Sequence, residues 1–215
     1  MTADAGRTTP GDPESGAGAA LRVDAMGNRS RVVEVARETF AERGLDVTMR
    51  EIARRAGVGV ATLYRRFPTK EALITEVFAE QVTACLAAVD DALADTDPWR
   101  GFCTVVGKVC AMQAADRGFS GAFLAAVSGE AGFARDLDRN ARGFAELTRR
   151  AQDGGLLRAD FVPGDLRLVL MANAGVVANS PHGAPAASRR LVALLLQSLR
   201  AHPEDPPGPL PPPSS

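Results

Sequence analysis

The sequence predicts an all-helical protein, and two observations support this fold class. Apolar residues recur every three or four positions through most of residues 28–200, which places them on one face of a helix. No segment alternates apolar and polar residues as a half-buried strand does, and there is no internal repeat. We therefore expect a fold made of packed helices.

The composition is that of a globular protein. Of the 215 residues, 46% are hydrophobic and 24% are charged. No apolar run reaches the roughly 18 residues that a membrane span needs, so no membrane contact is expected. The first residues lack the apolar core of a secretory signal peptide, and a cytoplasmic location is expected.

The two ends differ in composition from the helical region. Residues 1–27 are rich in Gly, Ala, Pro, Thr and Asp and show no periodicity, which predicts a disordered leader. Residues 201–215 hold seven of the fourteen prolines, which predicts a disordered, polyproline-like tail.

The first two expected helices have clear boundaries. The first has an apolar residue at every fourth position from Val32 to Phe40 and ends at Gly44. The second begins at Thr48, which has the spacing of a capping box with Glu51. Its apolar side is expected to pack on the first helix.

A tight turn separates the second expected helix from the third. Gly57 suits the left-handed backbone of such a turn, because it has no Cβ. Gly59 is expected to precede the third helix, which runs to Phe67 and is ended by Pro68. Caps at Thr69 and at Asp97-Pro98 open later helices, and the remaining expected helices span residues 69–95, 97–117, 120–127, 132–153, 163–178 and 187–200.

Charge is distributed unevenly along the chain. Residues 28–70 carry ten Lys and Arg against five Asp and Glu, a net charge of +5. The rest of the chain then carries −6, because the total is −1. A basic segment on an acidic body is typical of a local site for a polyanion, although a solvated helical face would have the same charge.

The third expected helix separates into two faces. Leu63 and Phe67, four residues apart, are expected to pack against the first two helices. Thr62, Arg65 and Arg66 share the other side, where hydroxyl and cationic groups can reach phosphates and base edges in a DNA major groove. Spacing alone leaves open an amphipathic helical hairpin with a basic outer face.

Neighbouring residues extend this surface. Tyr64 can donate its hydroxyl to a phosphate, and Lys70 lies at a helix start, where amides and a cation favour one. Arg50, near the start of the second helix, offers a similar contact. The complete set of expected DNA-contacting residues is Thr48, Arg50, Gly59, Val60, Ala61, Thr62, Tyr64, Arg65, Arg66 and Lys70.

Residues 29–78, about a quarter of the chain, resemble the TetR family of bacterial transcriptional regulators. The resemblance rests on the capping box at 48–51, the turn at 57–58, and the run from Thr62 to Phe67 followed by Lys70. It implies that the residues matching Thr62, Tyr64, Arg66 and Lys70 contact DNA.

The resemblance also implies the domain organisation. A three-helix helix-turn-helix DNA-binding domain is expected at residues 28–75, and a larger helical ligand-binding and dimerisation bundle at residues 76–200. The chain departs from the family at Gly59, where members commonly carry Ser or another polar residue. Since Val60 and Ala61 are also small and apolar, base readout there is expected to use thymine methyl contacts.

In the family, the second domain encloses a mostly apolar pocket for a small organic effector. Apolar side chains on separate helices could line one, although ordinary core packing explains each of them: Phe102, Val106, Met112, Phe119, Phe123, Phe133, Phe144 and Met171. Four amides could bind a ligand, although solvent or backbone partners are equally open to them: Gln113, Asn140, Asn173 and Asn179. The expected effector contacts are Phe102, Met112, Gln113, Phe123, Asn140, Phe144, Met171 and Asn173.

The last two long helices, at 163–178 and 187–200, are the expected homodimer interface. The second of them has more apolar residues than one seam needs: Leu191, Val192, Leu194, Leu195, Leu196 and Leu199. Two such helices from each subunit would form a four-helix bundle. The two reading helices would then lie about 34 Å apart, facing a palindromic operator.

No catalytic, metal-binding or cofactor-binding pattern is present. The two histidines, His182 and His202, lie in a Pro-Gly loop and in the tail. Cys85, Cys103 and Cys110 lack metal-ligand spacing and are interpreted as small buried hydrophobes. We expect no enzyme activity, no metal and no cofactor.

The leading hypothesis is a ligand-responsive repressor that binds double-stranded operator DNA as a homodimer. One alternative is a DNA-binding activator or architectural protein without a ligand, which would lack an enclosed polar cavity. Another is an all-helical small-molecule carrier whose basic helices no longer bind DNA.

Overall fold

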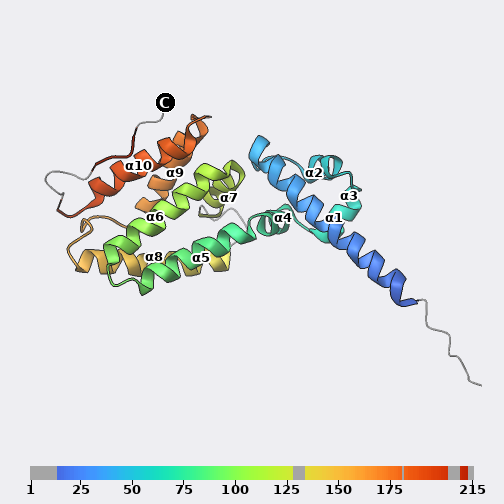
Figure 1. Cartoon of the computed structure of the whole chain (residues 1–215), viewed down its shortest axis with the longest axis horizontal. Coiled ribbons are helices and arrows are strands. Elements are labelled where there is room, and N and C mark those ends of the chain that lie inside the picture. Colours follow the sequence, from blue (N-terminus) through green and yellow to red (C-terminus); the bar gives the residue numbers. More distant parts are fainter. Residues whose placement is uncertain (1–13, 128–133, 181, 203–208, 213–215) are drawn as a thin grey trace, which may run out of the picture.

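The computed structural model describes residues 14–127, 134–180, 182–202 and 209–212, with the side chains of 14–27, 126–127 and 134–137 left aside. Within these ranges the protein is all-helical, which confirms the predicted fold class (Figure 1). The ten helices are α1 (Glu14–Arg43), α2 (Met49–Ala56), α3 (Val60–Arg66), α4 (Lys70–Val77), α5 (Ala79–Ala94), α6 (Pro98–Ala115), α7 (Arg117–Val127), α8 (Ala134–Asp153), α9 (Asp165–Ala178) and α10 (Ala184–Leu199).

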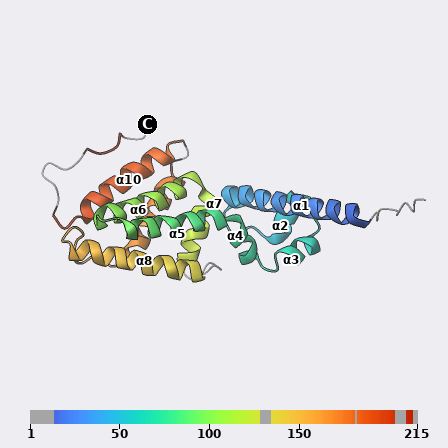
Figure 2. The ribbon, with the colours of Figure 1, turned by 60° about the horizontal axis from the view of Figure 1, so that its bottom comes forward.

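The helices form an elongated molecule with two parts. At one end α2 and α3 lie against α1, and we call this unit, residues 28–67, the head (Figure 1). At the other end α5 to α10 pack together as the body, residues 79–199, and α4 lies between the two parts (Figure 2). Because α1 contacts α2, α4 and α7, it connects head and body.

The helix expected over residues 69–95 is two helices, α4 and α5, which meet at an angle of 59°. Phe78 forms the break, with backbone angles of φ −110° and ψ 15°. Its buried ring packs between Phe40 and Phe119, with ring centroids 6.2 Å and 6.1 Å away. Burial of this ring in the joint therefore outweighs the local preference for a continuous helix.

A second break falls at Asp116, so that α6 and α7 meet there. The Asp116 carboxylate accepts a hydrogen bond from the Phe119 backbone N–H at 3.0 Å and so caps α7. We expected the helix that follows to begin at Ser120. It begins at Arg117, because the capping residue is the aspartate.

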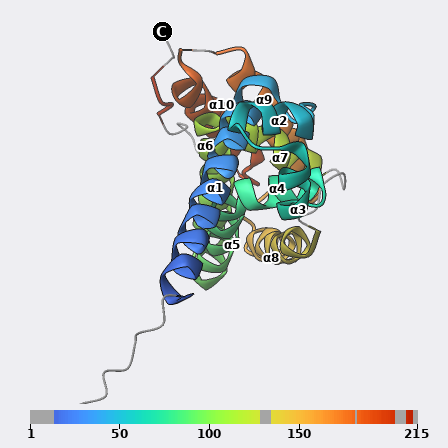
Figure 3. The same ribbon diagram turned by 90° about the vertical axis from the view of Figure 1, so that its right-hand side faces the viewer.

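The predicted leader was too long. The backbone of residues 14–27 is helical and continues α1, whose first turns extend beyond the head (Figure 3). This segment contains several Ala residues and a Leu, which favour helix strongly. Residues 1–13 and Phe133 lie outside the described residues. Helix α10 begins at Ala184, three residues earlier than expected, with a proline in its first turn.

One hydrophobic core runs through both parts of the molecule. Its aromatic residues form a row from the head into the body, in the order Phe40, Phe78, Phe119 and Phe123, and the last two ring centroids are 5.3 Å apart. Gly118 of α7 lies so close to α1 that a Cβ there would be 3.0 Å from the Ala41 backbone nitrogen. Head and body are therefore packed directly on each other.

The end of α10 is tied to the loop between α8 and α9. Leu157 and Arg200 form an isolated antiparallel β-bridge, flanked by a backbone hydrogen bond of 3.0 Å from Ala201 N to the Leu156 oxygen. The Arg200 guanidinium stacks over Trp99, 5.0 Å from the ring centroid. The chain that follows Ala201 therefore starts from a fixed point.

By length and hydropathy, none of the described helices could cross a membrane singly, whereas the bent pair α4 and α5 passes that test together. Among the described residues, no group of His, Cys, Asp or Glu side chains is arranged to hold a metal ion.

Candidate nucleic-acid interface

The start of α2 is held by the predicted cap. The Thr48 hydroxyl accepts a hydrogen bond from the Glu51 backbone N–H at 3.2 Å. Ile52, Ala53 and Ala56 are buried, so this side of α2 packs into the core as expected. The exposed side carries Arg50, which makes no hydrogen bond or ion pair within the described part of the chain. Because the cap fixes the start of α2, it also fixes where the Arg50 side chain projects from the helix.

The turn between α2 and α3 has the geometry predicted for it. Gly57 adopts the left-handed conformation, with φ +66° and ψ 33°, and its N–H bonds back to the last turn of α2. A Cβ built there would lie 3.6 Å from Nη2 of Arg31, so the Arg31 guanidinium lies over the turn. Arg31 was not among the residues expected to contact DNA.

The inner face of α3 is anchored in the head core. Leu63 has no exposed surface, and Phe67, just after the helix, is also buried. The guanidinium of Arg29 stacks over the Phe67 ring, 5.2 Å from its centroid, and donates to the Glu76 carboxylate at 3.0 Å. Arg29 therefore braces α3 and α4 from α1. This role could not be predicted, because neither Phe67 nor Glu76 is near Arg29 along the chain.

The outer face of α3 points to solvent. Tyr64 is 47% exposed, Arg65 and Val60 are exposed, and Thr62 is half-buried. Gly59 precedes the helix with an extended backbone and offers no side-chain cap. The residues of α3 in the expected contact set are thus exposed or half-buried, and the apolar ones stand at the start of the helix.

Arg66 has an unusual environment on this surface. It is half-buried, and its Nη1 atom is shielded from solvent without a hydrogen-bond partner. A guanidinium has five N–H donors, and a buried donor without an acceptor is costly. An anionic oxygen placed beside α3 would supply the missing acceptor.

Half of the ten cations in residues 28–70 are engaged within the protein. Glu51 accepts from Arg54 at 2.7 Å and also pairs with Arg43 and Arg55, while Arg55 pairs with Glu42 at 2.7 Å. The others engaged this way are Arg29, described above, and Arg37, which donates to the Val77 backbone oxygen at 2.9 Å. These five side chains are therefore paired within the protein, and Arg43 and Arg54 among them are exposed as well.

The remaining cations make no hydrogen bond or ion pair among the described residues, and they are Arg31, Arg50, Arg65, Arg66 and Lys70. Four of them are among the expected DNA contacts, and Arg31 lies over the turn between α2 and α3. Lys70 is the first residue of α4, whose start is capped by the Thr69 hydroxyl, which accepts from Ala72 N at 3.1 Å. The unpaired cations therefore gather around α3.

Comparison with known proteins identifies this unit. Residues 32–77 match the family described as "Bacterial regulatory proteins, tetR family", and residues 97–201 match the "Transcriptional regulator SbtR-like, C-terminal domain". The chain belongs to the TetR family. Membership makes it a DNA-binding transcriptional regulator rather than an enzyme, as predicted, and implies operator binding by the head and effector binding by the body.

Individual proteins are similar to part of this chain in sequence or to most of it in fold. An HTH-type transcriptional regulator of Staphylococcus aureus, SAB2452, is 43% identical over 54 residues, which are 25% of this chain and 29% of that relative. The ketosteroid transcriptional regulator KstR2 of Mycobacterium tuberculosis has a similar fold, with a TM-score of 0.58, 21% identity, and coverage of 80% and 94% of the two chains. The regulator FadR of Bacillus subtilis, solved with stearoyl-CoA, gives a TM-score of 0.57 at 16% identity over 80% and 99%.

The body of this TetR-family regulator contains a buried polar network. Asn173 of α9 has no exposed surface and donates to the Cys110 backbone oxygen at 3.1 Å and to Gln113 Oε1 at 3.0 Å. Its Oδ1 accepts from the Ser188 hydroxyl of α10 at 2.7 Å. The network joins α6, α9 and α10. Ser188 was not among the polar residues expected in the body, and its position beside Arg189 and Arg190 gave no sign that it is buried.

Two amide atoms in the body are buried without a partner. Gln113 is fully buried, and its Nε2 donates to no described atom. Asn140 Oδ1, on α8, is likewise shielded and unpaired. Asn179 differs, because it is exposed and donates to the Gly175 backbone oxygen at 2.8 Å. Gln113 and Asn140 thus remain candidates for ligand contact.

The apolar residues expected to contact an effector differ in burial. Phe102 and Phe144 are buried against each other, with ring centroids 5.3 Å apart, and Phe123 packs on Phe119. Met112 is half-buried. The expectation for Met171 is not met, because it is 48% exposed on the outer face of α9. Its neighbour Leu170 faces the core, and successive helix positions differ by about 100°.

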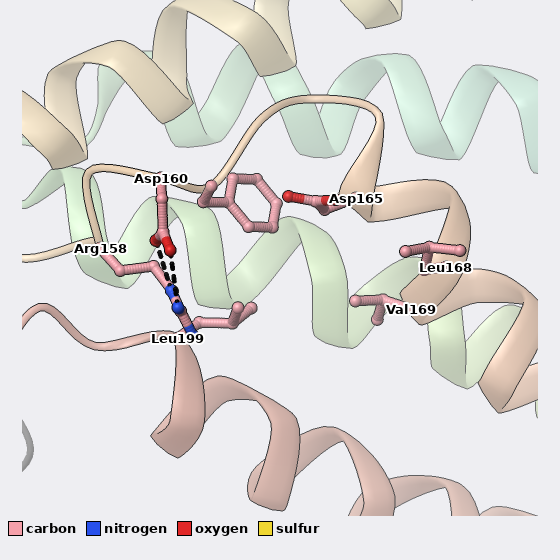
Figure 4. A pocket seen from close by; sticks show the side chains of 7 residues that line it. Arg158, Asp160, Asp165, Leu168, Val169 and Leu199 are labelled. Atoms are coloured by element: carbon pink, nitrogen blue, oxygen red, sulfur yellow. Dashed lines mark hydrogen bonds and ion pairs between the residues drawn. The ribbon is translucent and has the colours of Figure 1, made fainter.

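A cavity of about 280 Å³ lies beside the start of α9 and the end of α10 (Figure 4). Its lining includes none of the expected effector contacts and consists of Arg158, Asp160, Phe161, Asp165, Leu168, Val169 and Leu199. Arg158 donates two hydrogen bonds to Asp160, at 2.6 Å and 2.8 Å, so these two charges neutralise each other.

The three cysteines are free. Burial raises the pKa of the Cys85 and Cys110 thiols to about 12 and that of Cys103 to about 11. All three stay protonated at neutral pH. Cys85 and Cys110 are buried as expected, whereas Cys103 is half-buried.

Proposed function

We propose that this TetR-family regulator is a ligand-responsive repressor that binds a palindromic operator as a homodimer in the cytoplasm. One observation carries the DNA-binding part of the proposal. The unpaired cations of residues 28–70 lie on and beside α3, whereas the other five are paired with carboxylates or, for Arg37, with a backbone oxygen of the protein. A surface that only needed solvation would not require this separation.

The roles on this surface follow from position. Tyr64, Arg50 and Lys70 contact phosphates, while Thr62 and Arg65 reach base edges or backbone in the major groove. Arg66 binds an anionic oxygen with its unpaired Nη1. The apolar start of α3, at residues 59–61, reads thymine methyl groups.

Arg31 adds a contact beyond the ten residues expected from the sequence. Its guanidinium lies over the Gly57 turn, which joins α2 to the reading helix. We place a phosphate there, because an exposed cation at the edge of the reading helix lowers the electrostatic energy of a nearby anion.

Exposed apolar side chains support the homodimer. Leu168 of α9 is 63% exposed, Met171 is 48% exposed, and Leu194 of α10 is 45% exposed. The two helices pack on each other, and the pair of them would bury these side chains against a second copy. The expected interface through the last two long helices is consistent with this distribution.

The effector proposal rests on unpaired polar atoms inside the body. Gln113 Nε2 needs an acceptor and Asn140 Oδ1 needs a donor, and both are shielded from water. An uncharged molecule with an apolar body and a hydrogen-bonding group such as a carbonyl or hydroxyl suits them. The printed name of one protein of the same fold, a ketosteroid regulator, fits an uncharged ligand of this kind, whereas stearoyl-CoA, with which another was solved, fits only the apolar part of the description because its coenzyme A portion is charged.

Coupling between effector and DNA would run through the joint of head and body. The aromatic row from Phe40 to Phe123 passes through Phe78, at the break between α4 and α5. The Val77 backbone oxygen accepts from Arg37 of α1. A ligand that shifts α7 or α5 would therefore move α4 and the spacing of the two heads. Coupling of about 1–3 kcal/mol would weaken operator binding several-fold.

Selection of bound sequences from random double-stranded DNA tests the proposal directly. A palindromic site is expected, and the double change Tyr64→Ala and Arg66→Ala should abolish binding to it. Lys108→Ala, which removes a cation from the body, is the control and should leave affinity unchanged. Recovery of the same site by the double variant would refute the assignment of α3.

A second measurement separates the repressor from a ligandless DNA-binding activator or architectural protein. Steroid and acyl compounds are screened for a thermal shift, and any that binds is added to the operator complex. Loss of operator affinity supports the ligand-responsive repressor. Unchanged affinity at saturation supports the ligandless alternative.

A further inference from the structure

Part of the proline-rich segment is docked on the protein. Residues 209–212 return beside α10, as Figures 1 and 2 show. Nη1 of Arg190 donates a hydrogen bond to the backbone oxygen of Pro211. Leu210 and Pro211 are half-buried, whereas the residues on either side of them are exposed. A freely disordered tail was expected here, and these four residues instead lie extended against a helix.

The chemistry of the contact suits a proline-rich chain. An extended polyproline segment makes no internal hydrogen bonds, so its carbonyl oxygens need donors from elsewhere. Proline also has few backbone conformations to lose when it docks. Arg190 supplies a charged donor, which makes a stronger bond than a neutral one. The hydrogen bond from Arg190 can therefore hold segment 209–212 against α10 in an equilibrium between docked and released states.

The docking face is the outer side of α10. Ser188 and Val192, two positions before and after Arg190, are buried toward the core. Arg190 must then point away from the core, because residues two apart lie on opposite sides of a helix. Leu194, one turn further along, shares the outer face with Arg190 and is 45% exposed.

This outer face is also the surface that a second subunit would need. Together with Leu168 and Met171 of α9, Leu194 forms the apolar surface assigned above to the homodimer. We propose that the segment 209–212 competes with the second subunit for α10, so that each protomer must release its tail before the dimer forms. This inference rests on the proposed homodimer through α9 and α10.

The connecting segment is long enough for both states. Ala201 is fixed by its hydrogen bond to Leu156. From there to Pro211 an extended polyproline chain spans about 31 Å, whereas α10 rises only about 15 Å between Arg190 and Arg200. The tail can therefore leave α10 without disturbing the helix. Because it is tethered, its effective concentration at Arg190 is about millimolar.

The size of the effect follows from two tails per dimer. Suppose that in each protomer the docked tail is about threefold to tenfold more populated than the released tail. The association constant of the dimer then falls by roughly the square of that factor, about tenfold to a hundredfold. Sedimentation velocity over a range of protein concentrations measures this constant. A chain ending at His202 should dimerise about tenfold to a hundredfold more tightly than the full chain.

Point variants separate the tail from the helix surface. In the full chain, Arg190→Ala should tighten the dimer as truncation does. The control Arg189→Ala, an exposed neighbour with no hydrogen bond or ion pair to described residues, should not. In the truncated chain, Arg190→Ala reports only what Arg190 itself does at the dimer surface, so the tail's contribution is the tightening that the variant produces in the full chain beyond its effect in the truncated chain.

The outcomes distinguish this proposal from the homodimer itself. Equal dimer constants for full and truncated chains would overturn the competition and leave the homodimer intact. Weaker dimerisation of the truncated chain would also overturn it, because the tail would then belong to the interface. Absence of a dimer in both chains would refute the homodimer and, with it, the competition.

Discussion

Gly57 sets the angle between α2 and α3, and substitution by alanine isolates its backbone role. The residue adopts φ +66°, which L-residues other than Gly and Asn rarely do. A Cβ at this position would meet only Arg31 Nη2, at the ordinary contact distance of 3.6 Å. Any loss of stability in Gly57→Ala therefore comes from the backbone and not from a steric clash.

The expected loss of stability in Gly57→Ala is the balance of two free-energy contributions. A left-handed conformation costs an alanine about 1–2 kcal/mol. Alanine also lowers the conformational entropy of the unfolded chain, which offsets about 0.4–1 kcal/mol. The net destabilisation should be about 1 kcal/mol, which lowers the melting temperature by about 2–4 °C in a protein of this size.

Gly59→Ala is the matched control, two residues further on. Gly59 has φ −63° and ψ 140°, which any residue adopts, and a Cβ there also meets one atom at 3.6 Å, Thr62 Oγ1. The entropy gain of alanine roughly cancels its weaker capping, so the free energy of unfolding should stay near that of the wild type. Gly57→Asn should recover part of the loss at Gly57, because asparagine tolerates the left-handed region.

Urea unfolding followed by far-ultraviolet circular dichroism measures the three variants against the wild type. The expected order of stability places Gly59→Ala level with the wild type, Gly57→Asn below it and Gly57→Ala lowest. If the two alanine variants were equally stable, the turn would not depend on a left-handed residue, and the geometry assigned to the reading helix would be wrong.

Three further predictions concern the joint, the buried network and a surface carboxylate. Gly118→Ala would place a Cβ 3.0 Å from the Ala41 backbone nitrogen, so α7 must move from α1, and unfolding should become easier by about 1–3 kcal/mol in a thermal melt. Asn173→Leu leaves the fully buried Gln113 amide without its partner, and urea unfolding should show a loss of about 2–4 kcal/mol. Hydrogen bonds from Arg54 hold the pKa of Glu51 at about 2, below the ordinary 4.5. A carboxyl with a depressed pKa stabilises the fold above its unfolded pKa, and this contribution is lost as pH falls toward 2. The difference in melting temperature between wild type and Glu51→Gln should therefore shrink from pH 5 to about 2.

Each of these has a clear contrary result. An unchanged melting temperature for Gly118→Ala would show that α1 and α7 are not tightly packed. A neutral effect of Asn173→Leu would mean that the network is replaced by simple burial of a leucine. A constant difference between wild type and Glu51→Gln across that pH range would show that Glu51 is not selectively stabilised in the folded state.

Local features of the head could be predicted because they depend on neighbours in the chain. The Thr48 cap needs only the amide three residues later, and the Gly57 turn needs only a residue without a Cβ. The burial of Leu63 and Phe67 follows from their spacing on a helix. In the same way, the caps at Thr69 and Asp97 placed the starts of α4 and α6 correctly.

Features that depend on distant residues were missed. The break at Phe78 exists because two aromatic rings from other helices enclose that side chain. The spacing could not show which cations are free, because Arg29 is paired with Glu76, 47 residues away. The outward position of Met171 likewise depends on which side of α9 meets the body.

Arg50 and Arg54 give the most direct test of the interface, because they lie one turn apart on α2 and differ mainly in pairing. Arg50 is free within the described chain, whereas Arg54 is held by Glu51 at 2.7 Å. Operator affinity is measured by fluorescence anisotropy between about 50 and 200 mM salt. Arg50→Ala should reduce the slope of log affinity against log salt by about 0.9 for each subunit, and Arg54→Ala should leave it unchanged. If both variants reduced this slope equally, Arg54 would contact DNA as Arg50 does. The division of the cations into those paired within the protein and those that contact DNA would then be wrong.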